Sequence, residues 1–271
     1  MIDMSKIDYA LLDQPAISNV LFHPRLEFGY PVSAKNDSRI MIPVEADIHV
    51  GARFHLTEKS GANILFFHGN GEIVADYDDF GHIINQMGVN FLAVDYRGYG
   101  RSTGHPTVTA MMRDCHMIFD FVTHWLTNNG YTGSMVLMGR SLGSASVLEL
   151  SSHYPNQIEG LIVESGFANS APLLQILGIN TIDIGFEEPM GFQNADKIAN
   201  FHKPTLIIHA EQDHIIPFAE GVLLFERCPA ADKTLLNIPN ANHNNIFMQG
   251  LPDYLAALST FVQRLTSSTN Q

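Results

Sequence analysis

The sequence predicts an α/β fold in which helices wind doubly around a mostly parallel sheet. From residue 61 onward, short β-branched and apolar runs alternate with longer segments of helical pattern. Runs that are apolar throughout are typical of strands buried on both faces, and right-handed helical crossovers join such strands in a parallel sheet. The expected strands are Asn63–Phe67, Val89–Val94, Ser134–Met138, Gly160–Val163, Thr205–His209 and Thr234–Ile238.

The sequence before these strands follows a different pattern. Ile40–Val44 and Asp47–Phe54 alternate like half-buried strands, and no helical segment separates them. Consecutive strands without a crossover helix are typical of an antiparallel pair. We therefore expect an antiparallel N-terminal ribbon, preceded by an arm of about residues 1–37 in which Gln14–Pro31 is irregular.

One connection shows clear helical periodicity. Across Val108–Asn129, apolar residues recur at spacings of three and four, which places them on one face of a helix. This stripe predicts a helix that packs against the sheet rather than a ligand groove. Its members are Met111, Met112, Cys115, Ile118, Phe119, Val122, Trp125 and Leu126.

The connection over about residues 166–200 is longer than a single crossover helix requires. Its turn-forming residues are Pro172, Gly178, Gly185, Pro189 and Gly191. Long connections of this kind are often functional lids, so we expect a short cap over the top of the sheet. No repeat or linker interrupts the chain, and the sequence therefore predicts a single domain, residues 1–271.

The composition argues against several classes of protein. The chain has 15 Lys and Arg against 28 Asp and Glu, and its formal charge of −13 repels nucleic acid and anionic membranes. The first residues lack the pattern of a secretory signal, and no apolar run reaches the roughly 18 residues that cross a bilayer. We therefore expect a cytoplasmic protein with no nucleic-acid partner and no stable membrane anchor.

The metal-binding residue types lack the spacing of a metal site. Cys115 and Cys228 are too few for a disulfide framework or a thiolate zinc site, so we expect both thiols to be reduced and packed. The 13 histidines include no pair at His-Glu-x-x-His spacing. The sequence therefore predicts neither a metal nor another cofactor.

A candidate nucleophile stands between an apolar strand and a helical segment. Gly139–Gly143 reads Gly-Arg-Ser-Leu-Gly. A serine forced into a sharp strand-to-helix turn projects its hydroxyl above the sheet, and the flanking glycines avoid side-chain clashes there. Because the five letters alone are common, the position after a buried strand is the stronger signal. We therefore expect Ser141 to be a nucleophile.

A serine hydroxyl needs a base to take its proton and an acid to orient that base, in the chain order serine, acid, histidine. Asp213 and His243 each follow the end of an expected strand, which is the edge where open parallel sheets build their sites. Glu164 also follows a strand directly and is an alternative acid. We expect His243 to be the base and favour Asp213 over Glu164 as its acid.

Attack on a carbonyl creates an alkoxide, which enzymes stabilise with two backbone N–H groups. One donor should be the amide of Leu142, directly after the nucleophile. The other should lie in the glycine-rich segment His68–Gly71 after the strand Asn63–Phe67, and we choose Asn70. We interpret His68 as a residue that braces this loop rather than as a catalytic base.

The segment Asp95–Ser102 closes the next strand with charges and glycines. It lacks the Lys-Ser/Thr ending of a phosphate-binding loop. We interpret it as a turn that buttresses the oxyanion loop through Asp95 and Arg97. Structural or solvent-facing roles are expected for His105, His209 and His214.

Together these motifs resemble those of the α/β-hydrolase superfamily, in particular the small, short-capped serine hydrolases that include depalmitoylating thioesterases and related acyl-ester hydrolases. The resemblance spans most of the chain and implies an α/β-hydrolase fold. It also implies a triad of Ser141, Asp213 and His243 and an oxyanion hole made by the amides of Asn70 and Leu142. The motifs that carry it are His68–Gly71, Asp95–Ser102, Gly139–Gly143, Pro204–Asp213 and Asn242–Asn244.

The sequence thus predicts a serine hydrolase that cleaves a small-molecule carboxylic ester or thioester through an acyl-enzyme. An apolar acyl group is favoured because the cap is rich in apolar side chains. Candidates for the acyl pocket are Phe167, Leu173, Leu177 and Phe186. Burial of the cap against the sheet explains these four residues equally well.

Two other functions fit the same residues. A proline-type aminopeptidase or amide hydrolase would need a carboxylate that holds a free amine, and Glu187 or Glu188 in the cap could supply it. A hydrolase fold that serves only as a binding module is the other alternative, because a fold does not guarantee a function. The presence of all three triad residue types argues against it.

Overall fold

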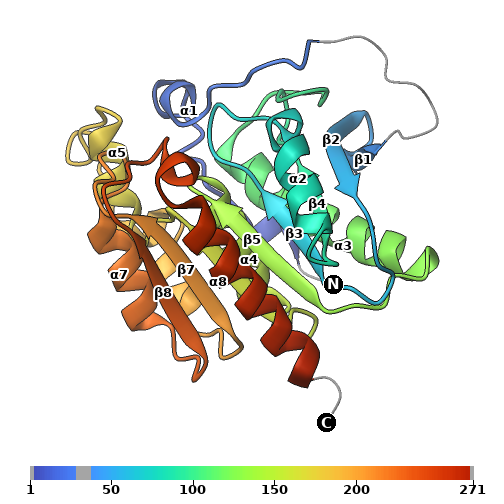
Figure 1. The fold of residues 1–271 in the computed structure, drawn as a ribbon. Helices are drawn as coiled ribbons and strands as arrows, with labels where there is room; N and C mark the ends of the chain where they lie inside the picture. Colours follow the sequence, from blue (N-terminus) through green and yellow to red (C-terminus); the bar gives the residue numbers. More distant parts are fainter. Residues whose placement is uncertain (1–2, 29–37, 269–271) are drawn as a thin grey trace. The chain divides into compact units, whose positions relative to one another are not determined.

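The computed structural model describes residues 3–28 and 38–268. The chain divides into two compact units, a first unit of Met1–Gly133 and a second unit of Ser134–Gln271. Figure 1 shows the strands and helices of both units coloured along the sequence.

The strands of the first unit are β1 (Arg39–Glu45), β2 (Ile48–His55), β3 (Asn63–Phe67) and β4 (Asn90–Val94). They lie in the order β1-β2-β4-β3. The pairs β1–β2 and β2–β4 are antiparallel, whereas β3 and β4 are parallel. The predicted antiparallel ribbon is therefore confirmed. Every residue of β3 and β4 is buried, as their apolar sequences predict.

Two α-helices of this unit, α2 (Asp78–Asn85) and α3 (Val108–Asn128), pack against its strands. Helix α2 contacts β2 and β4, and α3 contacts β1. Helix α3 begins where the Thr107 side chain accepts a hydrogen bond from the N–H of Ala110, which satisfies one of the unpaired donors at a helix start. The amphipathic helix predicted over Val108–Asn129 is confirmed. The short 3-10 turns of the unit are η1 (Met4–Lys6) and η2 (Val74–Tyr77).

The prediction that Gln14–Pro31 is irregular is wrong over part of its length. Helix α1 spans Pro15–Leu21 and buries Ile17 and Leu21. A proline at the first helical position has no N–H to leave unpaired and its φ suits a helix. Seven residues are too few to show a helical period, which explains the missed helix. Residues 1–2 and 29–37 of the predicted arm lie outside the described residues.

The second unit contains parallel strands in the order β5-β6-β7-β8. Their bounds are Met135–Arg140, Gly160–Glu164, Thr205–Ala210 and Lys233–Ile238. Strands β5, β6 and β7 are buried along their whole length, whereas β8 is only half-buried over much of its length. The apolar runs thus located each strand to within two residues of its ends.

Helices follow each of these strands in the second unit. They are α4 (Gly143–His153), α5 (Ser170–Ile176), α6 (Asn194–Ile198), α7 (Phe218–Arg227) and α8 (Ile246–Ser268). Helix α4 packs on β5 and β6, and α7 packs on β7 and β8. Helix α8 contacts β7 and β8 and runs alongside β7 in Figure 1. It is kinked at Gly250, two residues before Pro252.

Residues 166–200, the predicted cap, contain α5, the 3-10 turn η3 (Glu188–Met190) and α6. The carboxylate of Glu188 accepts hydrogen bonds from the N–H groups of Ser170 and Ala171 at the start of α5. The Glu220 carboxylate of α7 accepts two more, from the N–H groups of Ala168 and Asn169, each at 2.9 Å. This connection is therefore fastened to the second unit, and its function as a lid stays a prediction.

Two further features bear on the sequence predictions. Cys115 and Cys228 are buried, and neither is part of a disulfide. Among the described residues, no helix has both the length and the apolar character needed to span a membrane.

Candidate active site

Ser141 lies in a sharp turn between β5 and α4. Its φ of 51° is in the left-handed region, which is strained for any residue with a side chain. A hydrogen bond of 2.8 Å from the Ser141 N–H to the Glu164 carbonyl anchors the turn to β6. A Cβ at position 139 would lie 2.5 Å from the carbonyl oxygen of Gly143, so the tight turn requires a glycine there. The sharp strand-to-helix turn that the sequence predicts is therefore present at Ser141, and the role of Ser141 as a nucleophile stays a prediction.

The second unit brings Ser141, His243 and Asp213 into one hydrogen-bonded chain. The distance from His243 Nε2 to Ser141 Oγ is 3.0 Å, and His243 Nδ1 lies 2.7 Å from Asp213 Oδ2. All three residues are buried, with exposed fractions of 5% to 8%. This is the geometry in which a histidine takes a proton from a serine while an acid orients the ring.

Asp213 is held as an anion. Its Oδ1 accepts hydrogen bonds from the N–H groups of Ile215 at 3.0 Å and Ile216 at 2.8 Å. Burial raises the pKa of Asp213, but the bond from His243 and these two backbone bonds lower that pKa further, so it lies below its usual value. An ionised Asp213 has no proton to donate. The proton therefore resides on Nδ1 of His243, and the Nε2 lone pair faces the Ser141 hydroxyl.

The alternative acid, Glu164, serves a different partner. Its carboxylate forms an ion pair with Arg140 and accepts a hydrogen bond of 2.6 Å from the hydroxyl of Tyr254. The carboxylate that contacts His243 is Asp213.

Arg140 is a residue of the site that the sequence analysis missed. It occupies the variable position before Ser141, and its Nη2 donates a hydrogen bond of 2.8 Å to the backbone carbonyl of His243. Arg140 and Glu164 are also cross-strand partners at the ends of β5 and β6. A signal was available in the sequence, because a cation and an acid each end an apolar run beside a candidate catalytic segment.

In the first unit, His68 braces the loop that carries the predicted oxyanion donor. Its Nδ1 lies 2.7 Å from the Gly69 carbonyl and its Nε2 lies 3.1 Å from Asp95 Oδ1. Both neighbours are acceptors, so both ring nitrogens carry protons. Burial lowers the pKa of His68, but the bond to Asp95 and the charge of that carboxylate raise it more, to above its usual value. His68 is thus a buried structural cation.

The predicted buttress beside this loop is partly correct. Asp95 Oδ1 contacts His68 and also accepts a hydrogen bond of 3.0 Å from the N–H of Val74. The prediction for Arg97 is wrong, because its guanidinium pairs with Asp114 of α3 at 2.6 Å and with Glu45 of β1 at 2.9 Å. Arg97 therefore joins α3 to the end of β1.

Asn70, the predicted donor in this loop, is clamped through its side chain. Its Oδ1 accepts hydrogen bonds from the Tyr99 hydroxyl at 2.6 Å and from the His23 N–H at 2.8 Å. Arg25 adds a bond of 3.2 Å to the carbonyl of Gly71. Within the described part of the chain, no acceptor is found for the backbone N–H of Asn70. The segment after α1 thus holds the loop while this amide is left unpaired.

The amide of Leu142, the other predicted donor, lies in the second unit. Leu142 immediately precedes α4. The N–H groups of the first turn of a helix point out of its N-terminal end, where they have no acceptor within the helix. The N–H of Leu142 likewise has no hydrogen-bond acceptor among the residues described. The joint action of Asn70 and Leu142 as one oxyanion hole stays a prediction.

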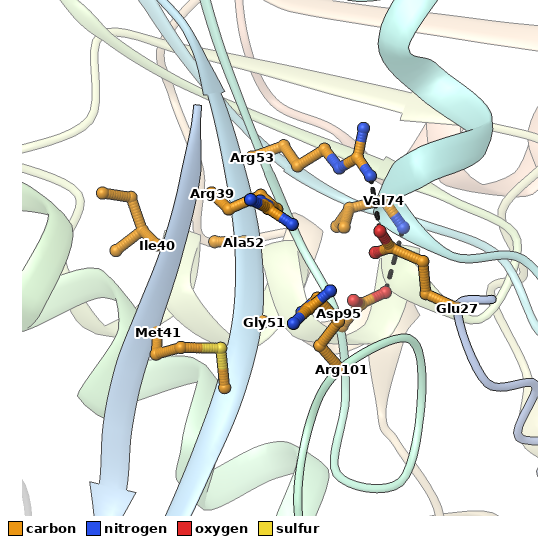
Figure 2. Close-up of a pocket in the computed structure, with 10 residues that line it drawn as sticks. All are labelled: Glu27, Arg39, Ile40, Met41, Gly51, Ala52, Arg53, Val74, Asp95 and Arg101. Atoms are coloured by element: carbon orange, nitrogen blue, oxygen red, sulfur yellow. Dashed lines mark hydrogen bonds and ion pairs between the residues drawn. The ribbon is translucent and has the colours of Figure 1, made fainter. Parts of the chain in front are cut away.

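Figure 2 shows the residues that line a small cavity in the first unit, Asp95 among them. The carboxylates of Glu27 and Asp95 lie beside arginine side chains, and Glu27 pairs with Arg53 at 2.8 Å. The cavity has a volume of about 10 Å³, which leaves room for about one water molecule. No acyl substrate fits in it. The residues that line it are Glu27, Arg39, Ile40, Met41, Gly51, Ala52, Arg53, Val74, Asp95 and Arg101.

The four predicted acyl-pocket residues differ in burial. Phe167 is 1% exposed and its ring packs edge-on against Phe192 at a centroid distance of 5.3 Å, so it belongs to the core. Leu173 is buried, and Leu177 and Phe186 are half-buried. Solvent-accessible apolar surface is therefore available at Leu177 and Phe186, and a role of the four residues in substrate binding stays a prediction.

The remaining candidate residues have structural or solvent-facing positions. His209 is buried, its Nε2 lies 2.8 Å from the Ile216 carbonyl, and burial lowers its pKa. His105 and His214 are exposed. Glu187 is exposed, whereas the carboxylate of Glu188 is occupied by the start of α5.

Comparison with known proteins finds relatives over most of the chain. The family model described as "Serine aminopeptidase, S33" matches residues 58–182. Alpha/beta hydrolase domain-containing protein 17C of Xenopus tropicalis is 31% identical over 208 residues, which are 73% of this chain and 61% of that protein. Alpha/beta hydrolase domain-containing protein 17B of Homo sapiens is 28% identical over 215 residues, 74% of this chain and 66% of that protein. The chain thus spans 61% to 66% of the length of these two relatives.

Solved structures share the architecture at low sequence identity. An esterase of Pyrococcus furiosus has a TM-score of 0.69 and 17% identity, covering 89% of this chain and 98% of that one. A monoacylglycerol lipase of Paleococcus ferrophilus has a TM-score of 0.64 and 19% identity, covering 80% of this chain and 99% of that one. These likenesses confirm the fold class that the sequence predicts.

Proposed function

We propose that the chain is a serine hydrolase of the α/β-hydrolase superfamily, with Ser141, His243 and Asp213 as its catalytic triad. The observation that carries this proposal is the continuous chain of contacts, 3.0 Å from Ser141 to His243 and 2.7 Å from His243 to Asp213. The left-handed φ of Ser141 supports it, because strained backbone of this kind is common at catalytic nucleophiles.

The proposed reaction proceeds through an acyl-enzyme. Ser141 Oγ adds to the substrate carbonyl carbon while His243 Nε2 takes the hydroxyl proton. His243 then gives that proton to the leaving alcohol or thiol as the bond to the acyl carbon breaks. Water repeats the sequence, which releases the carboxylic acid and restores Ser141. The amides of Leu142 and Asn70 are the proposed donors to the alkoxide, each worth on the order of 10²–10³ in rate.

We favour a small-molecule ester or thioester of an apolar acyl group as the substrate. The half-buried apolar side chains of Leu177 and Phe186 support this choice, as do the similar solved structures of an esterase and a monoacylglycerol lipase. The formal charge of −13 disfavours polyanionic partners such as nucleic acid. The cytoplasmic location expected from the sequence stays a prediction.

Amide cleavage at a free amino terminus is the competing activity. The description of the family model, a serine aminopeptidase, favours it. An aminopeptidase needs an unoccupied carboxylate for the substrate amine. Glu188 already accepts two backbone N–H groups, so of the two predicted candidates the exposed Glu187 is the one available. An ester or thioester substrate needs no such carboxylate, which makes it the better-supported proposal.

Hydrolysis of p-nitrophenyl esters by purified protein tests the proposed nucleophile. Ser141→Ala should remove activity, whereas Ser151→Ala should retain it, because Ser151 is buried in α4 and bonds only its own helix through the Leu148 carbonyl. Wild-type rates in Ser141→Ala would refute the proposal.

A panel of substrates tests the proposed acyl group. Esters and thioesters from acetyl to decanoyl should differ in kcat/KM, with a maximum at one chain length, and aminoacyl and prolyl amides should be poor substrates. Equal rates across all acyl lengths would remove the apolar-pocket proposal, and faster cleavage of the amides would replace it with the aminopeptidase.

A further inference from the structure

A buried polar network contacts two residues of the proposed triad in the second unit. Arg140 at the end of β5 forms an ion pair with Glu164 at the end of β6, and Tyr254 of α8 donates a hydrogen bond of 2.6 Å to the same carboxylate. Arg140 is 5% exposed, and Glu164 and Tyr254 are fully buried. The network thus joins elements that are far apart in the sequence.

This network touches both reacting residues of the proposed triad. Arg140 Nη2 donates a hydrogen bond of 2.8 Å to the backbone carbonyl of His243. The backbone carbonyl of Glu164 accepts a hydrogen bond of 2.8 Å from the N–H of Ser141. Glu164 therefore anchors the serine through its main chain and the histidine through Arg140.

Stability alone is a poor explanation for such a network. Desolvation of two charges offsets most of their attraction in a protein interior, and well-packed apolar side chains of similar size stabilise a fold as well or better. The residues before Arg140 and Glu164 in their strands are buried and mostly apolar, so apolar side chains would suit these positions. Apolar side chains could not, however, donate a hydrogen bond to the carbonyl of His243.

We propose that Arg140, oriented by Glu164 and Tyr254, is a positioning residue that sets the distance between His243 and Ser141. This inference rests on the proposed function. The His243 side chain projects from a loop between β8 and α8, and Arg140 binds that residue's own carbonyl. Proton transfer depends steeply on this geometry, because a displacement of about 1 Å can lower the rate about 10²-fold.

Arg140→Met should lower kcat for a p-nitrophenyl ester by about 10–100-fold while KM changes less than about twofold, since substrate binding is untouched. Arg140→Lys should restore part of the rate, because a single ammonium can pair with Glu164 or reach the carbonyl but lacks the two-armed geometry. Tyr254→Phe should cause a smaller loss of kcat, because it removes only the hydroxyl that orients Glu164.

The triple variant Arg140→Met, Glu164→Leu, Tyr254→Phe separates positioning from stability. It leaves no buried charge unpaired, so its melting temperature should stay near that of the wild type. Its kcat should remain as low as that of Arg140→Met. Recovery of wild-type kcat in this variant would overturn the proposal.

Lys197→Met provides a matched control in the same unit. Lys197 pairs with Glu149 at 2.6 Å, with side chains 13% and 6% exposed, and this ion pair joins α6 to α4. The control should change stability with little change in kcat. If Arg140→Met loses no more kcat than Lys197→Met at an equal loss of melting temperature, Arg140 is merely structural and the proposal fails.

Ser141→Ala, measured in parallel, distinguishes failure of this inference from failure of the proposed function. If Ser141→Ala is inactive and Arg140→Met is fully active, the inference about Arg140 fails while the proposed function stands. If Ser141→Ala is itself active, the proposed function fails and takes this inference with it.

Discussion

His68 in the first unit and His243 in the second are both buried histidines that contact an aspartate. His68 pairs with Asp95 at 3.1 Å, and His243 pairs with Asp213 at 2.7 Å. Their second ring nitrogens differ. That of His68 faces a backbone carbonyl, whereas that of His243 faces the hydroxyl of Ser141.

This difference assigns the two histidines different chemistry. A ring with acceptors at both nitrogens is held as a cation and has no lone pair for a substrate proton. A ring with an ionised acid on one side and a hydroxyl on the other keeps a lone pair on Nε2 and serves as a base. The partner of the second nitrogen therefore distinguishes a bracing histidine from a catalytic one.

Replacement of His243 should have the largest effect on activity. His243→Ala removes the proposed base, so kcat should fall by on the order of 10⁴-fold or more, with a modest change in melting temperature. Steady-state ester hydrolysis and thermal denaturation measure the two quantities. A fall in kcat smaller than that caused by His68→Gln would contradict the assignment of His243 as the base.

Replacement of Asp213 should have the next largest effect. Asp213→Asn leaves a neutral side chain that no longer holds the proton on Nδ1 of His243, so kcat should fall by about 10²–10⁴-fold. The change Glu211→Gln in the same loop is the control, because Glu211 is exposed and accepts only the N–H of Asn240. Equal losses from the two changes would contradict the role of Asp213.

The pH dependence of stability should distinguish Asp213 as well. Because the pKa of Asp213 is lowered in the folded protein, its stabilising contribution is present above its unfolded pKa of about 3.8 and is lost as pH falls through the lowered value. Asp213→Asn should therefore be less stable than wild type at pH 6, and the difference should shrink below pH 4. Urea denaturation at several pH values measures it, and a constant difference would contradict the ionised state.

Replacement of His68 should affect stability more than chemistry. His68→Gln should lower the free energy of unfolding by about 1–3 kcal/mol and kcat by about tenfold or less. The pKa of His68 is raised on folding, so its contribution is full below its unfolded value near 6.5 and is lost as pH rises through the raised value. The destabilisation should therefore be larger at pH 6 than at pH 9. A larger loss at pH 9 would contradict a buried cation.

Replacement of Arg25 should have the smallest effect. Its guanidinium is half exposed and pairs with Asp76, so Arg25→Ala should cost at most about 1 kcal/mol of stability. The lost bond to the Gly71 carbonyl should loosen the Asn70 loop and lower kcat a few-fold, with KM unchanged. Lys203→Ala, which removes an exposed ion pair with Glu159, is the control in ester hydrolysis and should leave kcat unchanged. A larger loss of kcat in Lys203→Ala than in Arg25→Ala would contradict the role of Arg25 in holding the Asn70 loop.

The sequence predicted the regular elements because their signals are local. Fully apolar runs located β3 and β4, and the stripe of α3 recurs over 21 residues. The elbow at Ser141 was predictable because a serine between glycines followed a buried strand. Helix α1 was missed because Pro15–Leu21 is only seven residues long, which is too short to show a helical period.

The polar partners could not be predicted from local patterns. Arg97 lies close in sequence to Asp95, which contacts the oxyanion loop. Only the fold reveals that the guanidinium of Arg97 pairs instead with Asp114 and Glu45. The choice between Asp213 and Glu164 likewise depended on the alignment of β5 with β6, which places Arg140 opposite Glu164. Both outcomes follow from contacts between residues far apart in the chain.

The most direct test of the central claim is mass spectrometry of the protein after incubation with a fluorophosphonate probe. The account predicts a single adduct on Ser141 in the wild type, no adduct in Ser141→Ala, and much slower labelling in His243→Ala, because the hydroxyl then lacks its base. Unchanged labelling in Ser141→Ala, or an adduct on another serine of the wild type, would contradict it.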